Sequence, residues 1–182
     1  YLFLTFGTAW GYELKSSGKI VANCHKIPSI NFDKTLSSST EITNQGIELV
    51  QLLEKENPAM KIVFSVSPVR HIKDGIIENS RSKAGLISAT HQIIEATTNT
   101  EYIPTYEWLI DDLRDYRFYG KDHVHPSEEA IEYIWEKLSL TLFEDATLIN
   151  IQTIQEILNA VNHKPFQVNS AGHQSFLKKI VS

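Results

Sequence analysis

The stretch Lys61-Ile62-Val63-Phe64-Ser65-Val66-Ser67-Pro68 decides the fold class, because it contains the clearest strand in the sequence. Apolar, β-branched and aromatic residues fill this strand, and Pro68 ends it. A helix is predicted directly before it. Ser38 and Glu41 form a capping box that begins about four helical turns, and Asn57-Pro58 ends them.

Strands and helices also alternate farther from this stretch. Tyr1–Phe6 is predicted to be a strand buried on both faces, and Lys19–Ala22 half of a hairpin. Glu101–Pro104 is predicted to be a short strand, with Pro104 either at a sheet edge or at the end of the strand. Helices are predicted over about residues 82–96 and from Ser127 onward. This alternation predicts an α/β fold with a parallel sheet and helices on both faces.

The carboxyl ends of parallel strands are where ligands bind in such sheets. These ends are predicted at Gly7–Trp10, at Ser67–His71 and in the loop after Ile103. We therefore expect functional residues in these three segments.

The composition is that of one ordinary globular domain, with 42% hydrophobic and 21% charged residues among 182. The 22 acidic residues outnumber the 17 basic ones, and the formal net charge is -5. We therefore expect no nucleic-acid partner and no membrane, but a small-molecule substrate. The single cysteine, Cys24, cannot form an internal disulfide, so the sequence permits a cytoplasmic location.

The segment most informative about function contains Asp122, His123, His125 and Pro126. An Asp three residues before a His on a turn can accept a hydrogen bond from the imidazole, which leaves the other ring nitrogen free as a general base. Asp122 and His125 are therefore the predicted catalytic pair. A loop-capping Asp beside solvated histidines would give the same pattern.

A metal-dependent hydrolase is a second interpretation, because His123 and His125 form a His-x-His pair that could bind zinc together with Asp122. Pro126 argues against it, since it disfavours the regular strand that would turn both rings to one side. We expect no metal and no cofactor.

Five blocks of this sequence together resemble the bacterial GSCFA family. They are Thr5–Trp10, Ala22–Lys26, Ser67–His71, Asn79–Ala84 and Leu113–Tyr119. The Asp-x-x-His-Pro-Ser block that follows is similar to the final block of the SGNH (GDSL-like) hydrolases. The likeness extends from residue 1 to about residue 140, and the blocks occur in the family's order.

The resemblance implies a flavodoxin-like three-layer α/β/α domain and ester hydrolysis by a serine, with Asp122 and His125 completing a triad. These 182 residues contain no Gly-Ser-Cys-Phe-Ala motif, which would supply that serine. We therefore expect residues 1–144 to be the carboxyl-terminal part of an SGNH-like domain whose first strands are missing. Residues 145–182 are expected to be a helical extension that packs on it. By analogy, the expected substrate is an acyl or acetyl ester, first of all an acylated carbohydrate.

Further site residues are predicted beside this family pattern. Gly7 and Asn23 are the predicted oxyanion-hole donors, because the Gly-x-Asn-Asp sequence of typical SGNH hydrolases is absent here. Arg70, His71 and Arg117 are predicted to contact substrate, since they lie at a strand end or next to the Asp122 loop.

The polar run Ser80-Arg81-Ser82-Lys83 contains an S-x-x-K pattern, but four polar residues at a predicted helix start favour a cap and a solvated face. We therefore expect these 182 residues alone to lack esterase activity. A non-catalytic binding module on the same fold is the remaining alternative. If the first strands are missing, the free edge at Tyr1–Phe6 would allow a homodimer to form by strand pairing.

Overall fold

The computed structural model describes residues 1–21, 26–162 and 175. Tyr1–Ile134 and Trp135–Ser182 form two compact units. The first unit contains a parallel sheet in the order β1-β5-β6. Its strands are Leu2–Phe6, Ile62–Val66 and Thr100–Tyr102. This mixed α/β architecture with a parallel sheet confirms the predicted fold class and is consistent with three α/β/α layers.

β5 is the central strand of the parallel sheet, and all of its residues are buried. It pairs with β1 from Leu2↔Ile62 onward and with β6 from Ile62↔Thr100 onward, in parallel on both sides. Within the described residues β6 lies at an edge of the sheet, which is one of the two positions that Pro104 allows.

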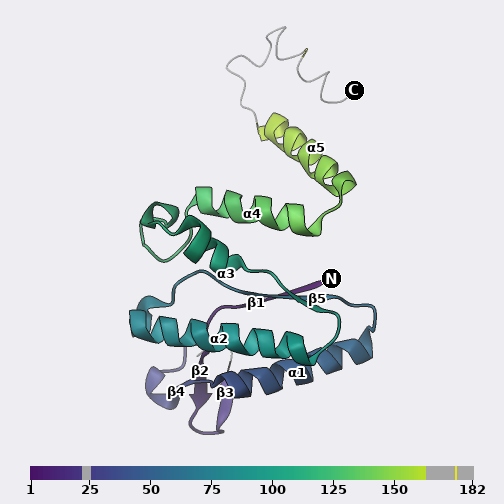
Figure 1. Cartoon of the computed structure of the whole chain (residues 1–182). Coiled ribbons are helices and arrows are strands. Elements are labelled where there is room, and N and C mark those ends of the chain that lie inside the picture. The colour runs from purple at the N-terminus through teal and green to yellow at the C-terminus, as the bar shows by residue number, and fades with distance from the viewer. Residues whose placement is uncertain (22–25, 163–174, 176–182) are drawn as a thin grey trace. The chain divides into compact units, whose positions relative to one another are not determined.

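Helices α1 (Ser39–Glu56) and α2 (Ile76–Ala96) lie side by side along the sheet (Figure 1). Val50 of α1, Ile93 of α2 and Phe64 of β5 are fully buried in one cluster between these elements. The hydrophobic effect therefore holds both helices against one face of the sheet.

The capping box at the start of α1 is present as predicted. Ser38 Oγ accepts a hydrogen bond from the Glu41 N–H at 3.2 Å, and the Glu41 carboxylate accepts one from the Ser38 N–H at 2.7 Å. These two bonds satisfy backbone donors that the first helical turn leaves unpaired.

Gly46 brings the two helices close together. A methyl group there would overlap Ile93 Cδ1 and lie 2.7 Å from Ile93 Cγ1.

We expect Gly46→Ala to lower the free energy of unfolding by about 1–2 kcal/mol, because overpacking outweighs the gain in helix propensity. Gly85→Ala in α2 is the matched control, since a methyl group there meets nothing within 4 Å. It should stabilise the protein by up to about 1 kcal/mol. Urea denaturation of both variants checks the opposite signs, and stabilisation by Gly46→Ala would contradict this account of the helix contact.

A second sheet is antiparallel, in the order β3-β2-β4. Its strands are Lys19–Val21, Trp10–Leu14 and Phe32–Leu36. β2 and β3 form the hairpin whose second half was predicted at Lys19–Ala22. β4 is not among the predicted strands, because the charged Asp33 and Lys34 interrupt its apolar pattern.

The expectation that Tyr1–Phe6 is buried on both faces is wrong for β1. Leu4 and Phe6 pack against the core under the helices, whereas Phe3 on the opposite face is 51% exposed. Within the described residues β1 pairs only with β5, so Phe3 and Thr5 direct their backbone N–H and C=O groups toward a free edge. Pairing of this edge with a second copy of the chain stays a prediction.

The elements after β6 carry the loop of interest. They are α3 (Thr105–Glu107), the π-helical η3 (Trp108–Leu113), the 3-10 turn η4 (Tyr116–Phe118), α4 (Glu128–Leu142) and α5 (Asp145–Asn162). In the part of the chain that the structure describes, no helix combines the length and apolar character needed to cross a membrane. The packing of residues 145–182 on the rest of the chain stays a prediction.

Candidate functional site

The segment between η4 and α4, residues 119–127, is a loop with a well-defined backbone. The Gly120 N–H donates to the His125 carbonyl at 2.8 Å. Ser127 Oγ accepts from the Ala130 N–H at 3.3 Å, so Ser127 caps α4 as predicted. The loop is thus anchored to itself and to the helix that follows.

Asp122 and His125 meet within this loop. Asp122 Oδ2 lies 2.7 Å from His125 Nδ1, and Asp122 Oδ1 accepts from the backbone N–H groups of Val124 and His125 at 2.9 and 3.1 Å. These hydrogen bonds, first of all the one to the imidazole, hold the pKa of Asp122 well below its usual range. An ionised carboxylate only accepts hydrogen bonds, so the hydrogen of this contact is on Nδ1, which leaves Nε2 as the ring nitrogen that can accept a proton.

The low pKa of Asp122 makes the order of this loop depend on pH. The carboxylate stabilises the loop above its ordinary pKa, and this contribution is lost as pH falls through the lowered folded-state pKa. We expect the carboxyl carbon of Asp122, followed by NMR, to titrate at a higher pH in His125→Ala than in the unchanged chain, because the largest cause of the shift is removed. The two backbone donors remain, so only part of the shift should disappear. Identical titration midpoints in the two proteins would show that the imidazole does not hold the carboxylate.

His123 is turned away from this pair. Its φ is +55°, and its ring meets the Tyr116 ring edge-on with 5.8 Å between centroids. Within the described residues, no group of three or more His, Cys, Asp or Glu side chains is arranged to hold a metal ion. The structure thus places Asp122 and His125 together, with His123 against an aromatic neighbour.

Arg70 connects the end of β5 to the same loop. Its N–H donates to the Val124 carbonyl at 3.2 Å, and its guanidinium donates to the His123 carbonyl at 3.3 Å. The guanidinium carbon also lies 4.1 Å from the ring centroid of Tyr119 and 5.3 Å from that of Tyr116. The predicted substrate-binding residue Arg70 therefore lies beside the loop that carries the histidine.

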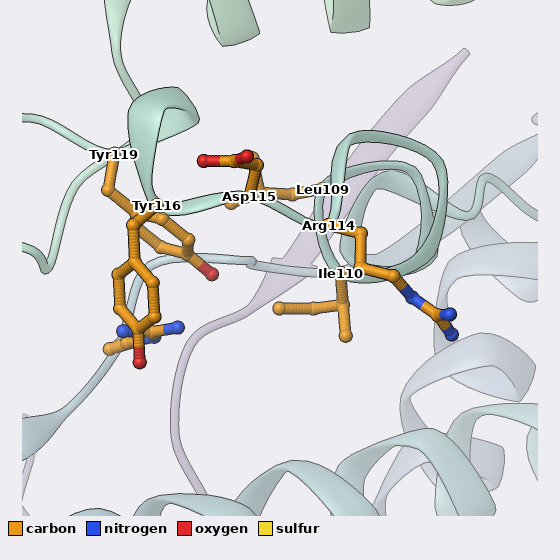
Figure 2. A pocket seen from close by; sticks show the side chains of 7 residues that line it. Leu109, Ile110, Arg114, Asp115, Tyr116 and Tyr119 are labelled. Atoms are coloured by element: carbon orange, nitrogen blue, oxygen red, sulfur yellow. The ribbon is translucent and has the colours of Figure 1, made fainter.

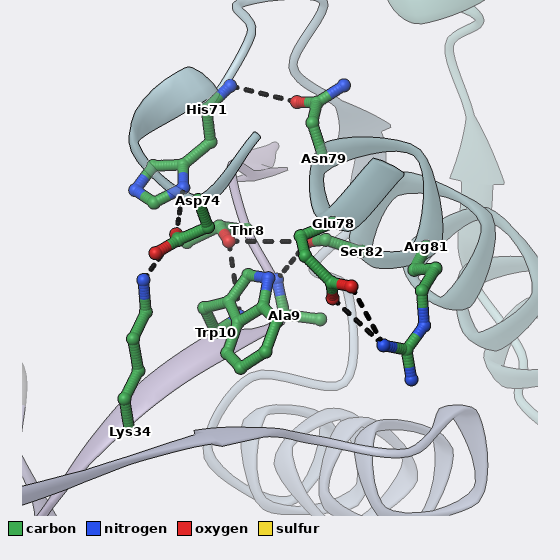
Figure 3. A network of polar contacts seen from close by, with 10 residues as sticks. All are labelled: Thr8, Ala9, Trp10, Lys34, His71, Asp74, Glu78, Asn79, Arg81 and Ser82. Atoms are coloured by element: carbon green, nitrogen blue, oxygen red, sulfur yellow. Dashed lines mark hydrogen bonds and ion pairs between the residues drawn. The ribbon is translucent and has the colours of Figure 1, made fainter. Parts of the chain in front are cut away.

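His71, the next residue, takes part in a different network (Figure 3). His71 Nδ1 lies 3.1 Å from Asp74 Oδ2, which also forms an ion pair with Lys34 of β4. The hydrogen bond from Lys34 lowers the pKa of Asp74, and the Lys34 ammonium lies 5.0 Å from the Trp10 ring centroid. This network ties η2 (Ile72–Asp74) to the antiparallel sheet.

Three other predicted residues have separate surroundings. The Arg117 guanidinium lies over the Phe118 ring at 4.6 Å. Gly7 follows β1, and its carbonyl accepts a hydrogen bond from Lys83 Nζ at 2.7 Å. Asn23 lies outside the described residues, as do the neighbouring Cys24 and His25. The oxyanion-hole role of Gly7 and Asn23 and the substrate role of Arg117 stay predictions.

The polar run Ser80–Lys83 is not the helix start that was predicted, and only its first two residues, Ser80 and Arg81, are exposed. Gly75 has a φ of +91°, which suits glycine, and α2 begins directly after it at Ile76, so the run lies inside the helix. Ser82 and Lys83 are 1% and 2% exposed. The sequence pattern did not predict their burial, because polar residues are mostly exposed. They are buried only where the fold supplies hydrogen-bond partners.

Those partners lie at the carboxyl ends of two strands. Lys83 Nζ donates to the carbonyls of Gly7 and Ser67 at 2.7 and 2.5 Å. Ser82 Oγ accepts from the Ala9 N–H at 2.7 Å (Figure 3). Two neighbouring side chains of α2 therefore hold the segments that leave β1 and β5, where ligand sites form in parallel sheets.

A pocket of about 130 Å³ lies next to Arg70 (Figure 2). Its lining residues are Arg70, Leu109, Ile110, Arg114, Asp115, Tyr116 and Tyr119. The two tyrosines are not among the predicted site residues, although they interleave with arginines in Leu113–Tyr119. That alternation of aromatic and basic side chains next to Asp122 is the signal that points to them.

Comparison with known families supports the resemblance. The model of the GSCFA family matches residues 1–138, and that of the GSCFA domain protein, C-terminal domain, matches residues 154–182. Searches of curated proteins and of solved structures found no significant match. The first family match covers more than half of the chain and includes the Asp122–His125 loop. The chain therefore belongs to the GSCFA family.

Proposed function

We propose that the protein is an ester hydrolase in which Asp122 orients His125 as the general base for a nucleophilic serine. The observation that carries this proposal is the 2.7 Å contact between Asp122 Oδ2 and His125 Nδ1, which leaves Nε2 free to take a proton. Family membership suggests a hydrolase-like function and supports the same class of reaction.

Among the described residues, no serine hydroxyl is hydrogen-bonded to the His125 ring. We propose, as the resemblance to the family implies, that the nucleophile is a serine upstream of these 182 residues. In the proposed reaction, His125 Nε2 takes the proton of this serine as its oxygen attacks the ester carbonyl. The imidazolium then protonates the departing alcohol, and water releases the acyl group by the reverse path. Asp122 stays ionised and stabilises the charged ring.

A fluorophosphonate probe tests the location of the nucleophile, because it reacts covalently with activated serines. The 182-residue chain should remain unlabelled and should not hydrolyse p-nitrophenyl acetate above background. A longer form that carries the preceding segment should be labelled at one serine outside residues 1–182 and should hydrolyse the ester. Labelling of the short chain that Ser80→Ala abolishes would place the nucleophile inside it. A longer form that is inactive on a broad ester panel would favour the binding-module alternative.

A further inference from the structure

The Tyr119 hydroxyl is a buried polar group that has no hydrogen-bond partner among the described residues. Tyr119 as a whole is only 8% exposed, and its ring packs in a cluster with Leu109 and Phe118. In Figure 2 its hydroxyl points toward the middle of the pocket. An unpaired buried hydroxyl costs about 1–3 kcal/mol, so a hydrogen bond from this group to an oxygen or nitrogen atom in the pocket would be favourable.

Arg70 offers hydrogen-bond donors at the same place. Its guanidinium lies against the Tyr119 ring, and in the described chain its only hydrogen bond from that group goes to the His123 carbonyl at 3.3 Å. No carboxylate pairs with it in that part of the chain. A guanidinium has five N–H donors in a planar fork, so most of them are available to a ligand.

The other polar groups of the pocket limit the charge of that ligand. The Arg114 side chain extends away from the two tyrosines (Figure 2) and pairs with Asp111 at 3.4 Å. Asp115 adds a negative charge, although its Oδ1 is occupied by the Arg117 N–H at 2.9 Å. With Arg114 paired, the pocket lining has one unpaired arginine and one aspartate, which suits a planar monoanion better than a phosphate dianion, and guanidinium and carboxylate match as a bidentate pair.

The volume of the pocket and its apolar lining residues limit the size and kind of the group that the pocket can hold. Pockets for drug-sized ligands measure about 300–1,000 Å³, whereas this one is near 130 Å³ and fits one small group or part of a ring. Leu109, Ile110 and the ring of Tyr116 provide apolar surfaces of the kind on which a sugar ring packs. Tyr116 also contacts the ring of His123, two residues before His125.

We propose that this pocket holds the carboxylate of an acidic sugar, so that the substrate is an acylated uronate, with Arg70 and the Tyr119 hydroxyl donating to the carboxylate. Only the acyl group of this substrate depends on the proposed ester hydrolysis. Binding of the acidic sugar is independent of hydrolysis, so a failure of either proposal can be recognised separately.

Binding of three methyl glycosides to the 182-residue chain, followed by NMR, tests the inference. They are methyl β-glucuronide, the neutral methyl β-glucoside and methyl β-glucoside 6-phosphate. The glucuronide should bind at least about 10-fold more tightly than the glucoside, since a hydrogen-bonded carboxylate distinguishes them. Equal binding of these two, tighter binding of the phosphate, or no binding of any of the three would overturn the carboxylate assignment.

Two conservative variants locate the binding groups. Tyr119→Phe keeps the buried ring and removes only the hydroxyl, and Arg70→Lys keeps the charge and removes the planar fork. Each should weaken glucuronide binding by about 10-fold and leave glucoside binding unchanged. Tyr12→Phe and Arg81→Lys, which do not line the pocket, are the matched controls and should bind as the unchanged chain does. Undiminished glucuronide binding by a folded Tyr119→Phe protein would refute the role of the hydroxyl.

Discussion

Replacement of His125 by alanine is expected to lower kcat for ester hydrolysis by about 10⁴- to 10⁶-fold in the form of the protein that carries the nucleophile. The reason is that a serine without a base is a weak nucleophile, and the members of a triad act as a unit. Asp122→Asn should cause a loss of about 10⁴-fold, because its amide would face Nδ1 as a donor and shift the ring hydrogen to Nε2. Steady-state kinetics on p-nitrophenyl acetate measures both losses.

His91→Ala is the matched control for His125→Ala. His91 lies on α2, where its ring centroid is 4.8 Å from that of Tyr102, and it is exposed. Its removal should change kcat by less than about threefold, since it touches neither Asp122 nor the pocket. If His125→Ala retained activity within about 10-fold of the unchanged protein, the imidazole would not be the base, and the proposed mechanism would be refuted.

Replacement of Lys83 by methionine is expected to lower the free energy of unfolding by about 2–4 kcal/mol. Methionine has a similar length and fills most of the space, but it cannot donate to the carbonyls of Gly7 and Ser67. Each buried carbonyl left without a donor costs about 1–3 kcal/mol, offset in part because a charged group no longer has to be buried. Urea denaturation measures the change, and Lys55→Met on the exposed side of α1 should stay within about 0.5 kcal/mol of the unchanged chain.

The effect of Lys83 should also depend on pH. Burial lowers the pKa of the Lys83 ammonium to about 8, below its value in the unfolded chain. Between these two pKa values the unfolded chain binds the extra proton, so the free energy of unfolding rises with pH there. The advantage of the unchanged chain over Lys83→Met should therefore grow as pH rises from about 8 toward 10. A stability difference near zero at pH 7, with both proteins folded, would show that the ammonium does not support these strand ends.

Several elements of this protein follow from local sequence signals. The run 62–66 is apolar and short, and it forms the central buried strand. Ser38 and Glu41 predict the start of α1 because the capping box uses only neighbouring residues. The Asp122-x-x-His125 spacing likewise predicts the contact between the two side chains, since both ends lie on one short turn. In each case the interacting groups are only a few residues apart, so their spacing in the sequence is enough to predict that they meet.

The tertiary structure decided the features whose partners are far apart in the chain. Phe3 is exposed on one side of β1, and Lys83 is buried in α2 where its polar character predicted a solvated position. Lys83 reaches a carbonyl 76 residues away, a pairing that no local periodicity describes. The pocket in the same way needs Arg70 at the end of β5 and Tyr119 after η4. The sequence by itself therefore determined the three parallel strands, the helix caps at Ser38 and Ser127 and the Asp–His pair, because these depend on local hydrogen bonds and periodicity. The burial of polar groups and the shape of the pocket were decided only by the topology, because it brings distant residues together and excludes water from them.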